Sequence, residues 1–227
     1  MPVLQMPKIP TATTAPGEAD AVQRFVFRDA DWALYEGISE AVGGRHVRLT
    51  YDGWRLELMT LSHRHERSSS LLNRFVNVLT EELNVPCQSG RSTTFKRKDL
   101  QKGIEADDCY YLEHEPDVRQ KDEIDLDIDP PPDLTIEVEV SRSALDRMAV
   151  YAAIKVSEVW RFDGDKIHVH VLGSDGNYEV VERSPHFPFL PMRELEAFLK
   201  RRTEIDETQL VKQFRQWVRE QIAKGWK

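Results

Sequence analysis

The positions of apolar and polar residues change period along the chain, which predicts a mixture of helices and strands. Apolar residues recur at helical spacing in some segments and at every second position in others. Helices are predicted at 63–84, 144–154, 191–202 and 206–224, with a shorter one inside 25–42. Strands are predicted at 46–51, 54–59, 92–97, 108–112, 133–140, 157–163, 166–172 and 177–182. This order predicts an α/β or α+β fold in which a central mixed β-sheet is flanked by helices.

Local residue preferences support several of these boundaries. Ser62 and Ser143 are typical helix caps, and the Asp52–Gly53 pair is typical of a hairpin turn. The stretch 113–132 is acidic and rich in proline, which predicts an exposed loop.

The two ends of the chain differ from its middle. Residues 1–20 are rich in Pro, Thr and Ala, which predicts a disordered tail. A single domain is predicted over 21–203. Residues 204–227 then supply a C-terminal helix whose large apolar residues either complete the core or cover a dimer interface.

The strand predicted at 133–140 begins the segment D-L-T-I-E-V-E-V-S-R, which has one apolar and one acidic side. The apolar side consists of Leu134, Ile136, Val138 and Val140. The other side carries Asp133, Glu137 and Glu139, although acids are poor strand formers and like charges on one face repel. Two interpretations follow: this side faces water, or its carboxylates hold a hard divalent cation such as Mg²⁺ or Mn²⁺.

A second acidic cluster precedes the strand predicted at 108–112. Glu105 and Asp107 lie just ahead of it. If the two strands are neighbours, Asp107 meets Glu137 and Glu139 around one ion. The alternative for Asp107 is an ordinary turn residue at the start of a strand.

Charge is distributed unevenly, although the net charge is −8. Residues 105–139 hold 14 acidic residues against two basic ones, so the rest of the chain is net positive. Residues 91–102 carry five basic residues and one acid. Four of these bases either contact nucleic-acid phosphates or solvate a loop: Arg91, Lys96, Arg97 and Lys98.

Cysteine usage and hydropathy bear on the compartment. Cys87 and Cys109 are the two cysteines, too few for a disulfide framework, which favours a reducing cytoplasm. No apolar run approaches the roughly 20 residues of a membrane span, and no secretory signal is evident at the start.

The acid ahead of one strand, followed by acid-x-acid on the next, resembles the PD-(D/E)XK superfamily, which has the restriction-endonuclease-like fold. More closely, the chain from about Phe27 to Leu199 resembles the Uma-type family of predicted endonucleases, long catalogued as a domain of unknown function. The segments that carry this resemblance are 48–60, 65–67, 92–100, 105–111, 131–141, 150–163 and 187–191.

The resemblance implies roles for particular residues. Asp107 would be the first metal ligand and Glu137 the second, with Mg²⁺ or Mn²⁺ as the ion. Glu139 stands where the superfamily has its lysine, and that basic residue falls instead on Arg147. Two further acids match positions that the family places near the site, Glu57 and Glu66. The implied activity is hydrolysis of phosphodiester bonds in DNA by a homodimer.

The chain departs from the family pattern at four positions. Ala106 replaces a proline, Lys155 a glycine and Ser157 a second proline, while Arg147 replaces a frequent lysine. Arginine pairs well with phosphate but stays protonated, so it cannot act as a general base. A catalytically impaired, nucleic-acid-binding protein with the nuclease fold is therefore the second interpretation. A remoter third is an assembly protein with a solvated acidic surface.

Histidines and tryptophans give weaker signals. His63 and His65 are two apart and do not share a helix face, so both are interpreted as an exposed helix start. His168 and His170 share one face of a strand but lack an evident third ligand for zinc. The large aromatic residues Trp54 and Trp160 are interpreted as core or interface residues.

Overall fold

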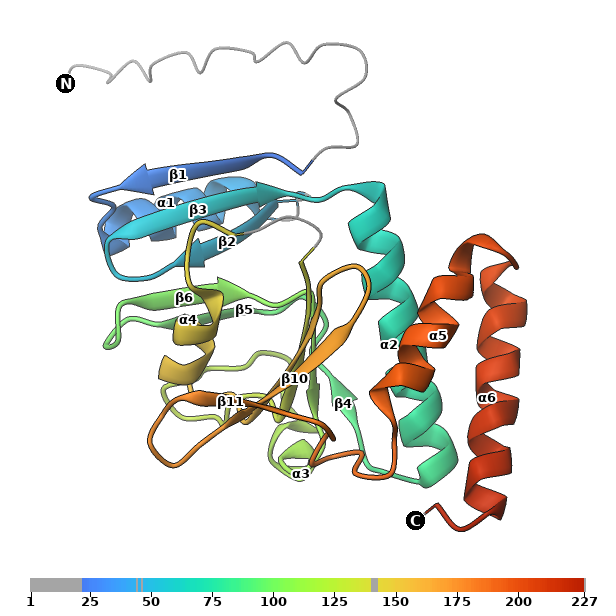
Figure 1. The fold of residues 1–227 in the computed structure, drawn as a ribbon. Coiled ribbons are helices and arrows are strands. Elements are labelled where there is room, and N and C mark those ends of the chain that lie inside the picture. The colour runs from blue at the N-terminus through green and yellow to red at the C-terminus, as the bar shows by residue number, and fades with distance from the viewer. Residues whose placement is uncertain (1–21, 44, 46, 140–142, 227) are drawn as a thin grey trace, which may run out of the picture.

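Two β-sheets and six α-helices make up the part of the chain that the computed structural model describes, residues 22–43, 45, 47–139 and 143–226 (Figure 1). The predicted tail at 1–20 lies outside these residues. The predicted class, an α+β fold with a mixed sheet flanked by helices, is confirmed. No helix in the described ranges is long and apolar enough to cross a membrane.

The first sheet has five antiparallel strands in the order β1-β3-β2-β6-β5. Their bounds are β1 Arg24–Arg28, β2 Val47–Tyr51, β3 Arg55–Thr60, β5 Thr94–Arg97 and β6 Lys102–Glu105. Helix α1, Trp32–Val42, is capped by Asp31 and packs on this sheet. Trp32, Tyr35 and Tyr51 form the aromatic centre of that contact. The two tyrosine rings are stacked, with their centroids 5.2 Å apart.

The second sheet has six strands in the order β11-β10-β9-β8-β7-β4, and only the β8–β9 pair is parallel. Their bounds are β4 Gln88–Ser89, β7 Asp108–Tyr111, β8 Leu134–Val138, β9 Glu158–Phe162, β10 Ile167–Leu172 and β11 Tyr178–Val181. Strands β7 and β8, which carry the two acidic clusters, are direct neighbours, as the metal interpretation requires.

Three long helices stack along one side of the molecule (Figure 1). Helix α2, His63–Leu83, begins at the predicted cap Ser62 and packs on β8. Outside it lie α5, Met192–Lys200, and α6, Glu207–Ala223, with the short 3-10 turn η1 at Arg201–Thr203 between them. The apolar residues of α6 complete this core, so the described structure supports that alternative for the C-terminal helix; the dimer remains a prediction.

The other face of β8 is covered by α4, Arg147–Ala153. Leu134, Ile136 and Val138 point into the α2 core, while Thr135 is fully buried on the opposite face. Every residue of β8 is therefore buried. The interpretation that the acidic side faces water is wrong, because a helix occupies that side.

Several boundaries differ from the predictions. Helix α4 begins three residues later than predicted, because Asp146 rather than Ser143 caps it. The predicted loop at 113–132 contains the short helix α3, Glu115–Val118. Strands β1, β4 and β6 were not predicted, since each is short and lacks a clear alternation of apolar residues.

Candidate active site

Asp107 and Glu137 are brought together where β7 and β8 run side by side. Asp107 precedes β7, and its Oδ2 accepts a hydrogen bond of 2.7 Å from the backbone N–H of Val138. The carboxylate thus takes the place of a backbone acceptor where the β7–β8 ladder ends. This bond fixes Asp107 beside the residue that follows Glu137.

The rest of the Asp107 environment is polar but incompletely paired. His65 of α2 donates from Nε2 to Asp107 Oδ2 at 3.0 Å. Asp107 Oδ1 is buried and accepts no hydrogen bond, and the nearest cation, Arg48 Nε, lies 3.6 Å away. Burial raises the pKa of Asp107, but the hydrogen bond and charge of His65, with Arg147 and the Val138 N–H, outweigh it and lower the pKa overall. Asp107 is therefore held as a carboxylate.

Glu137 is held by helix α4. Arg147 donates to both carboxylate oxygens, from Nε to Oε2 at 2.9 Å and from Nη2 to Oε1 at 2.7 Å, and Tyr151 also donates to Oε1. Burial raises the pKa of Glu137; the charge of Arg147 opposes this and that of Asp107 adds to it. Both oxygens of Glu137 are thus engaged by protein donors.

Arg147 is itself enclosed. Its guanidinium also donates to Thr50 Oγ1 of β2 and, at 2.7 Å, to the backbone carbonyl of Glu105. Burial lowers the pKa of Arg147, but the neighbouring Glu137 more than compensates, so the pKa rises and the side chain stays cationic. Arg147 therefore ties α4 to both sheets as well as neutralising Glu137.

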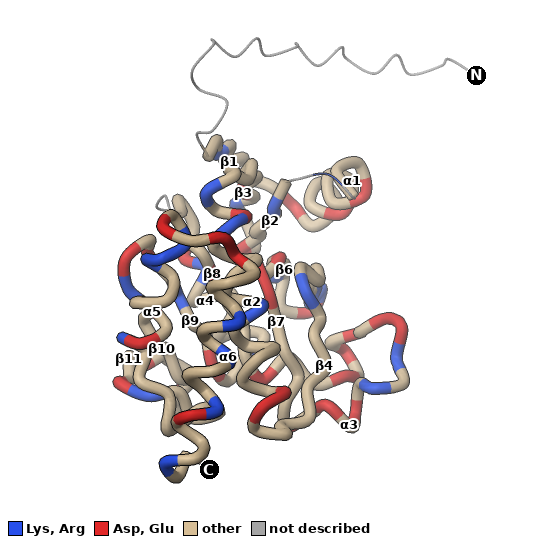
Figure 2. Tube along the Cα trace, turned by 90° about the vertical axis from the view of Figure 1, so that its right-hand side faces the viewer, with Lys and Arg blue, Asp and Glu red and all other residues tan. Residues whose placement is uncertain are grey.

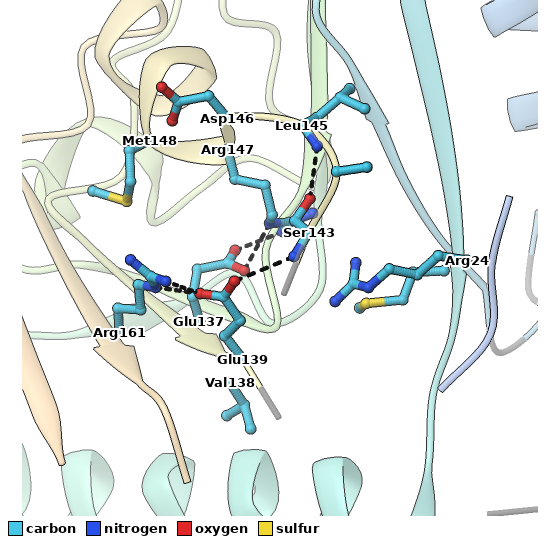
Figure 3. Close-up of a pocket in the computed structure, with 12 residues that line it drawn as sticks. Arg24, Glu137, Val138, Glu139, Ser143, Leu145, Asp146, Arg147, Met148 and Arg161 are labelled. Atoms are coloured by element: carbon cyan, nitrogen blue, oxygen red, sulfur yellow. Dashed lines mark hydrogen bonds and ion pairs between the residues drawn. The ribbon is translucent and has the colours of Figure 1, made fainter. Parts of the chain in front are cut away.

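Glu139 is directed to a separate set of partners (Figure 3). Its carboxylate pairs with Arg161 of β9 and accepts a bond of 3.2 Å from the Ser143 N–H. Over the described ranges, no group of three or more His, Cys, Asp or Glu side chains is placed to hold a metal ion. The three carboxylates of Asp107, Glu137 and Glu139 therefore do not converge on one ion site in this arrangement.

The other two predicted acids behave differently from each other. Glu57 of β3 is buried and accepts bonds of 2.8 Å from Arg24 Nη1, Ser143 Oγ and the Ala144 N–H. It therefore anchors the segment that leads into α4 and so positions Arg147. Glu66 is half-exposed and reaches the site only through His65, whose Nδ1 lies 3.4 Å from its Oε1.

Two cavities are lined by this acidic pair, one by Glu137 and the other by Asp107. The Glu137 pocket, about 340 Å³, is lined by Glu137, Glu139 and residues of α4, with Arg24 and Arg161 facing it (Figure 3). The Asp107 pocket, about 390 Å³, lies between α1, α2 and β5. It is lined by Arg45, Arg48, Leu61, Glu66, Arg91, Glu105 and Asp107, with Ser39, Val42, Gly43, Val47, Ser69, Ser70, Ser92 and Thr94.

The predicted nucleic-acid contacts are only partly near the site. Arg91 lines the Asp107 pocket, 3.5 Å from Asp108. Lys96 lies over the Tyr35 ring, Arg97 pairs with Asp99, and Lys98 is exposed. Eight of the 14 acids counted over 105–139 fall within 113–129, around α3 and the loop after it (Figure 2).

Sequence reasoning missed His65, which is 1% exposed and not part of an exposed helix start. That interpretation is wrong for His65, because its side chain turns inward to Asp107 just ahead of β7, whereas His63 is exposed as predicted. The signal available was a histidine three residues after the cap Ser62, at helical spacing from the buried Ser68 and Leu72. Tyr151, Thr50 and Arg48 were also missed.

The departures from the family pattern are accommodated in different ways. Ala106 is fully buried in the core under α4. Lys155 has a φ of 64°, in the left-handed region that favours glycine. This conformation explains why the family pattern has a glycine at this position. Ser157 donates a bond of 2.7 Å to the backbone carbonyl of Asp133.

An acid before one strand, a second acid on its antiparallel neighbour and a basic residue on the following helix define a restriction-endonuclease-like protein. The family model Uma2, described as "Putative restriction endonuclease", matches residues 41–206, and the chain belongs to this family. No curated protein matches the chain.

Proposed function

We propose that the protein is a metal-dependent endonuclease that hydrolyses phosphodiester bonds in DNA. The observation that carries this proposal is the buried Oδ1 of Asp107, which accepts no hydrogen bond and is fixed beside Glu137 at the end of the β7–β8 ladder. A buried acceptor without a donor is costly. A bound cation would remove that cost.

The carboxylate oxygens of Asp107 can bind a hard divalent ion as they stand. Those of Glu137 can do so only after a rearrangement. Asp107 is a carboxylate with one open oxygen, the donor type that Mg²⁺ and Mn²⁺ prefer. The oxygens of Glu137 become open to an ion only when the Arg147 side chain withdraws. Asp107 and Glu137 would hold the ion, which when bound lowers the pKa of water and neutralises charge on the scissile phosphate.

The side chains around the ion have distinct tasks. His65 and the Val138 N–H hold Asp107 Oδ2, which leaves Oδ1 free to bind. Arg147, released from Glu137, would donate to a non-bridging phosphate oxygen and stabilise the charge that develops there. Glu139, steadied by Arg161, would orient the attacking water.

This proposal implies two partners, DNA and a second copy of the chain. It also implies a cytoplasmic location. Cleavage of both strands of a duplex favours two active sites, hence a homodimer. The two cysteines, Cys87 and Cys109, are free thiols, which fits a reducing compartment.

A specific observation favours a second candidate, a nucleic-acid-binding protein that keeps the nuclease fold without turnover. The bidentate pair between Arg147 and Glu137, supported by Tyr151, satisfies the second ligand without any ion. In this candidate the pair is permanent, and Arg147 takes the place of the metal charge beside Glu137.

The experiment that separates the candidates is incubation of the purified protein with supercoiled and single-stranded DNA in Mg²⁺, Mn²⁺ or EDTA. The endonuclease nicks DNA only with metal, and Asp107→Asn abolishes nicking. A matched control is Arg193→Gln, an exposed arginine of α5. Binding without nicking in any metal supports the second candidate. A protein that neither binds nor nicks DNA rejects both candidates.

A further inference from the structure

The arginines of the two pockets differ in how they are paired. In the Glu137 pocket, Arg147 donates to Glu137, Arg161 pairs with Glu139, and Arg24 donates to Glu57 at 2.8 Å. These cations are therefore already neutralised by carboxylates at hydrogen-bond distance.

The Asp107 pocket has looser pairing. Arg48 lies 3.6 Å from Asp107 Oδ1, and Arg91 lies 3.5 Å from Asp108 Oδ2. Arg48 Nε is buried and makes no hydrogen bond, and neither does Asp107 Oδ1. A donor and an acceptor thus face each other, each without a partner at bonding distance.

One kind of ligand satisfies both of these atoms. A cation bound at Asp107 Oδ1 completes the acceptor, and an anionic oxygen carried by that cation accepts from Arg48 Nε. A phosphodiester is such an anion, and guanidinium donors match its non-bridging oxygens. Arg48 is the second residue of β2 and pairs with Met59 of β3, so the sheet fixes its backbone.

The rim of the Asp107 pocket suits a chain of phosphates. Arg45 and Arg91 are exposed there, and Ser69, Ser70 and Ser92 add hydroxyl donors. The pocket also contains Glu105, whose carboxylate accepts a hydrogen bond of 2.9 Å from Thr94 Oγ1.

We infer that the DNA backbone reaches the metal site through the Asp107 pocket, not through the Glu137 pocket. Arg48 donates to a non-bridging oxygen of the phosphate at Asp107, and Arg91 contacts a flanking phosphate. This inference rests on the proposed function for its choice of DNA as ligand, but it concerns binding and does not require cleavage.

The test measures the anisotropy of a short fluorescein-labelled duplex in Ca²⁺, a hard cation with oxygen ligands, over a series of salt concentrations. Arg48→Gln is expected to weaken binding on the order of 10-fold and to reduce the salt slope by about one, because one phosphate contact is lost. Arg91→Gln is expected to reduce the slope likewise. Asp107→Asn is expected to weaken binding, since the cation that carries the phosphate oxygen loses its carboxylate ligand. Arg193→Gln, on α5, is the control and keeps the wild-type affinity and slope.

The outcomes separate this inference from the proposed function. A wild-type slope in both Arg48→Gln and Arg91→Gln overturns the inference, even where metal-dependent nicking is found. Weakened binding in both, with no nicking by the wild-type protein, supports the inference and rejects the nuclease. Arg91 is 65% exposed, so its variant tests the pocket even where Arg48→Gln fails to fold.

Discussion

Arg147 donates two hydrogen bonds to Glu137, from Nε at 2.9 Å and from Nη2 at 2.7 Å. The pair occupies both oxygens of one of the two carboxylates that we propose as metal ligands. Because Arg147 stays cationic, the pair is not broken by deprotonation of Arg147.

Replacing Arg147 by the lysine frequent in the family is expected to increase metal-dependent nicking. Lysine is a point charge that cannot hold both oxygens of Glu137, and it can lose its proton when buried. We expect an increase on the order of 100-fold, the lower end of what a positioned acid or base contributes. Initial nicking rates in Mn²⁺ measure it, with Arg193→Lys as the matched control. Equal rates for Arg147→Lys and the wild type would show that the pair does not limit cleavage.

Removing one member of the pair is expected to destabilise the protein more than removing both. Glu137→Gln leaves the buried Arg147 without its counter-charge. This is expected to lower the free energy of unfolding by about 3–5 kcal/mol. The double variant Glu137→Leu/Arg147→Met replaces both charges with apolar groups and should cost less than the single one. Urea unfolding of the three proteins gives the comparison. A double variant less stable than Glu137→Gln argues against a buried charge as the cause.

Glu57 and Glu66 are expected to differ sharply in their effect on stability. Glu57→Gln turns an amide NH₂ toward one of the donors that Glu57 accepts from, Arg24, Ser143 or Ala144. The lost acceptor is expected to lower the free energy of unfolding by about 1–3 kcal/mol. Glu66→Gln, at a half-exposed position, should stay within about 0.5 kcal/mol of the wild type. Comparable losses in the two variants would contradict the anchoring role of Glu57.

The buried pair between His186 and Glu158 is expected to make stability depend on pH. Burial lowers the pKa of His186, but the hydrogen bond to Glu158 at 2.5 Å and nearby carboxylates outweigh it and raise the pKa above 6.5. A raised folded pKa means that the pair contributes fully below pH 6.5 and loses its contribution as the pH rises through the folded value. His186→Gln should therefore flatten the fall in unfolding free energy above pH 6.5. An unchanged pH slope would mean that the two states share one pKa.

Much of the site could be predicted because it depends on short-range patterns. The alternation in β8 predicts that Glu137 projects opposite Ile136 and Val138, and the acid ahead of β7 predicts a neighbouring carboxylate. Antiparallel pairing of β7 with β8 then brings Asp107 to Glu137. The long helix α2 was predicted nearly to the residue, since its cap and apolar stripe are local features.

The remaining features depend on which elements cover which faces. Alternation cannot say that α4 covers the acidic side of β8, so Tyr151 and Arg147 were not predicted to bind Glu137 through both oxygens. The contact between His65 and Asp107 joins residues 42 positions apart, which no local pattern encodes. Glu139 lies beyond the end of β8, where its direction depends on Arg161 of the next strand.

The most direct test of the central claim is an anomalous-difference map from crystals of the wild-type protein grown with Mn²⁺. The proposed site predicts a peak about 2.1 Å from Asp107 Oδ1, with Arg147 withdrawn from Glu137. A fully bidentate Arg147–Glu137 pair and no Mn²⁺ peak at Asp107, at saturating Mn²⁺, would contradict it.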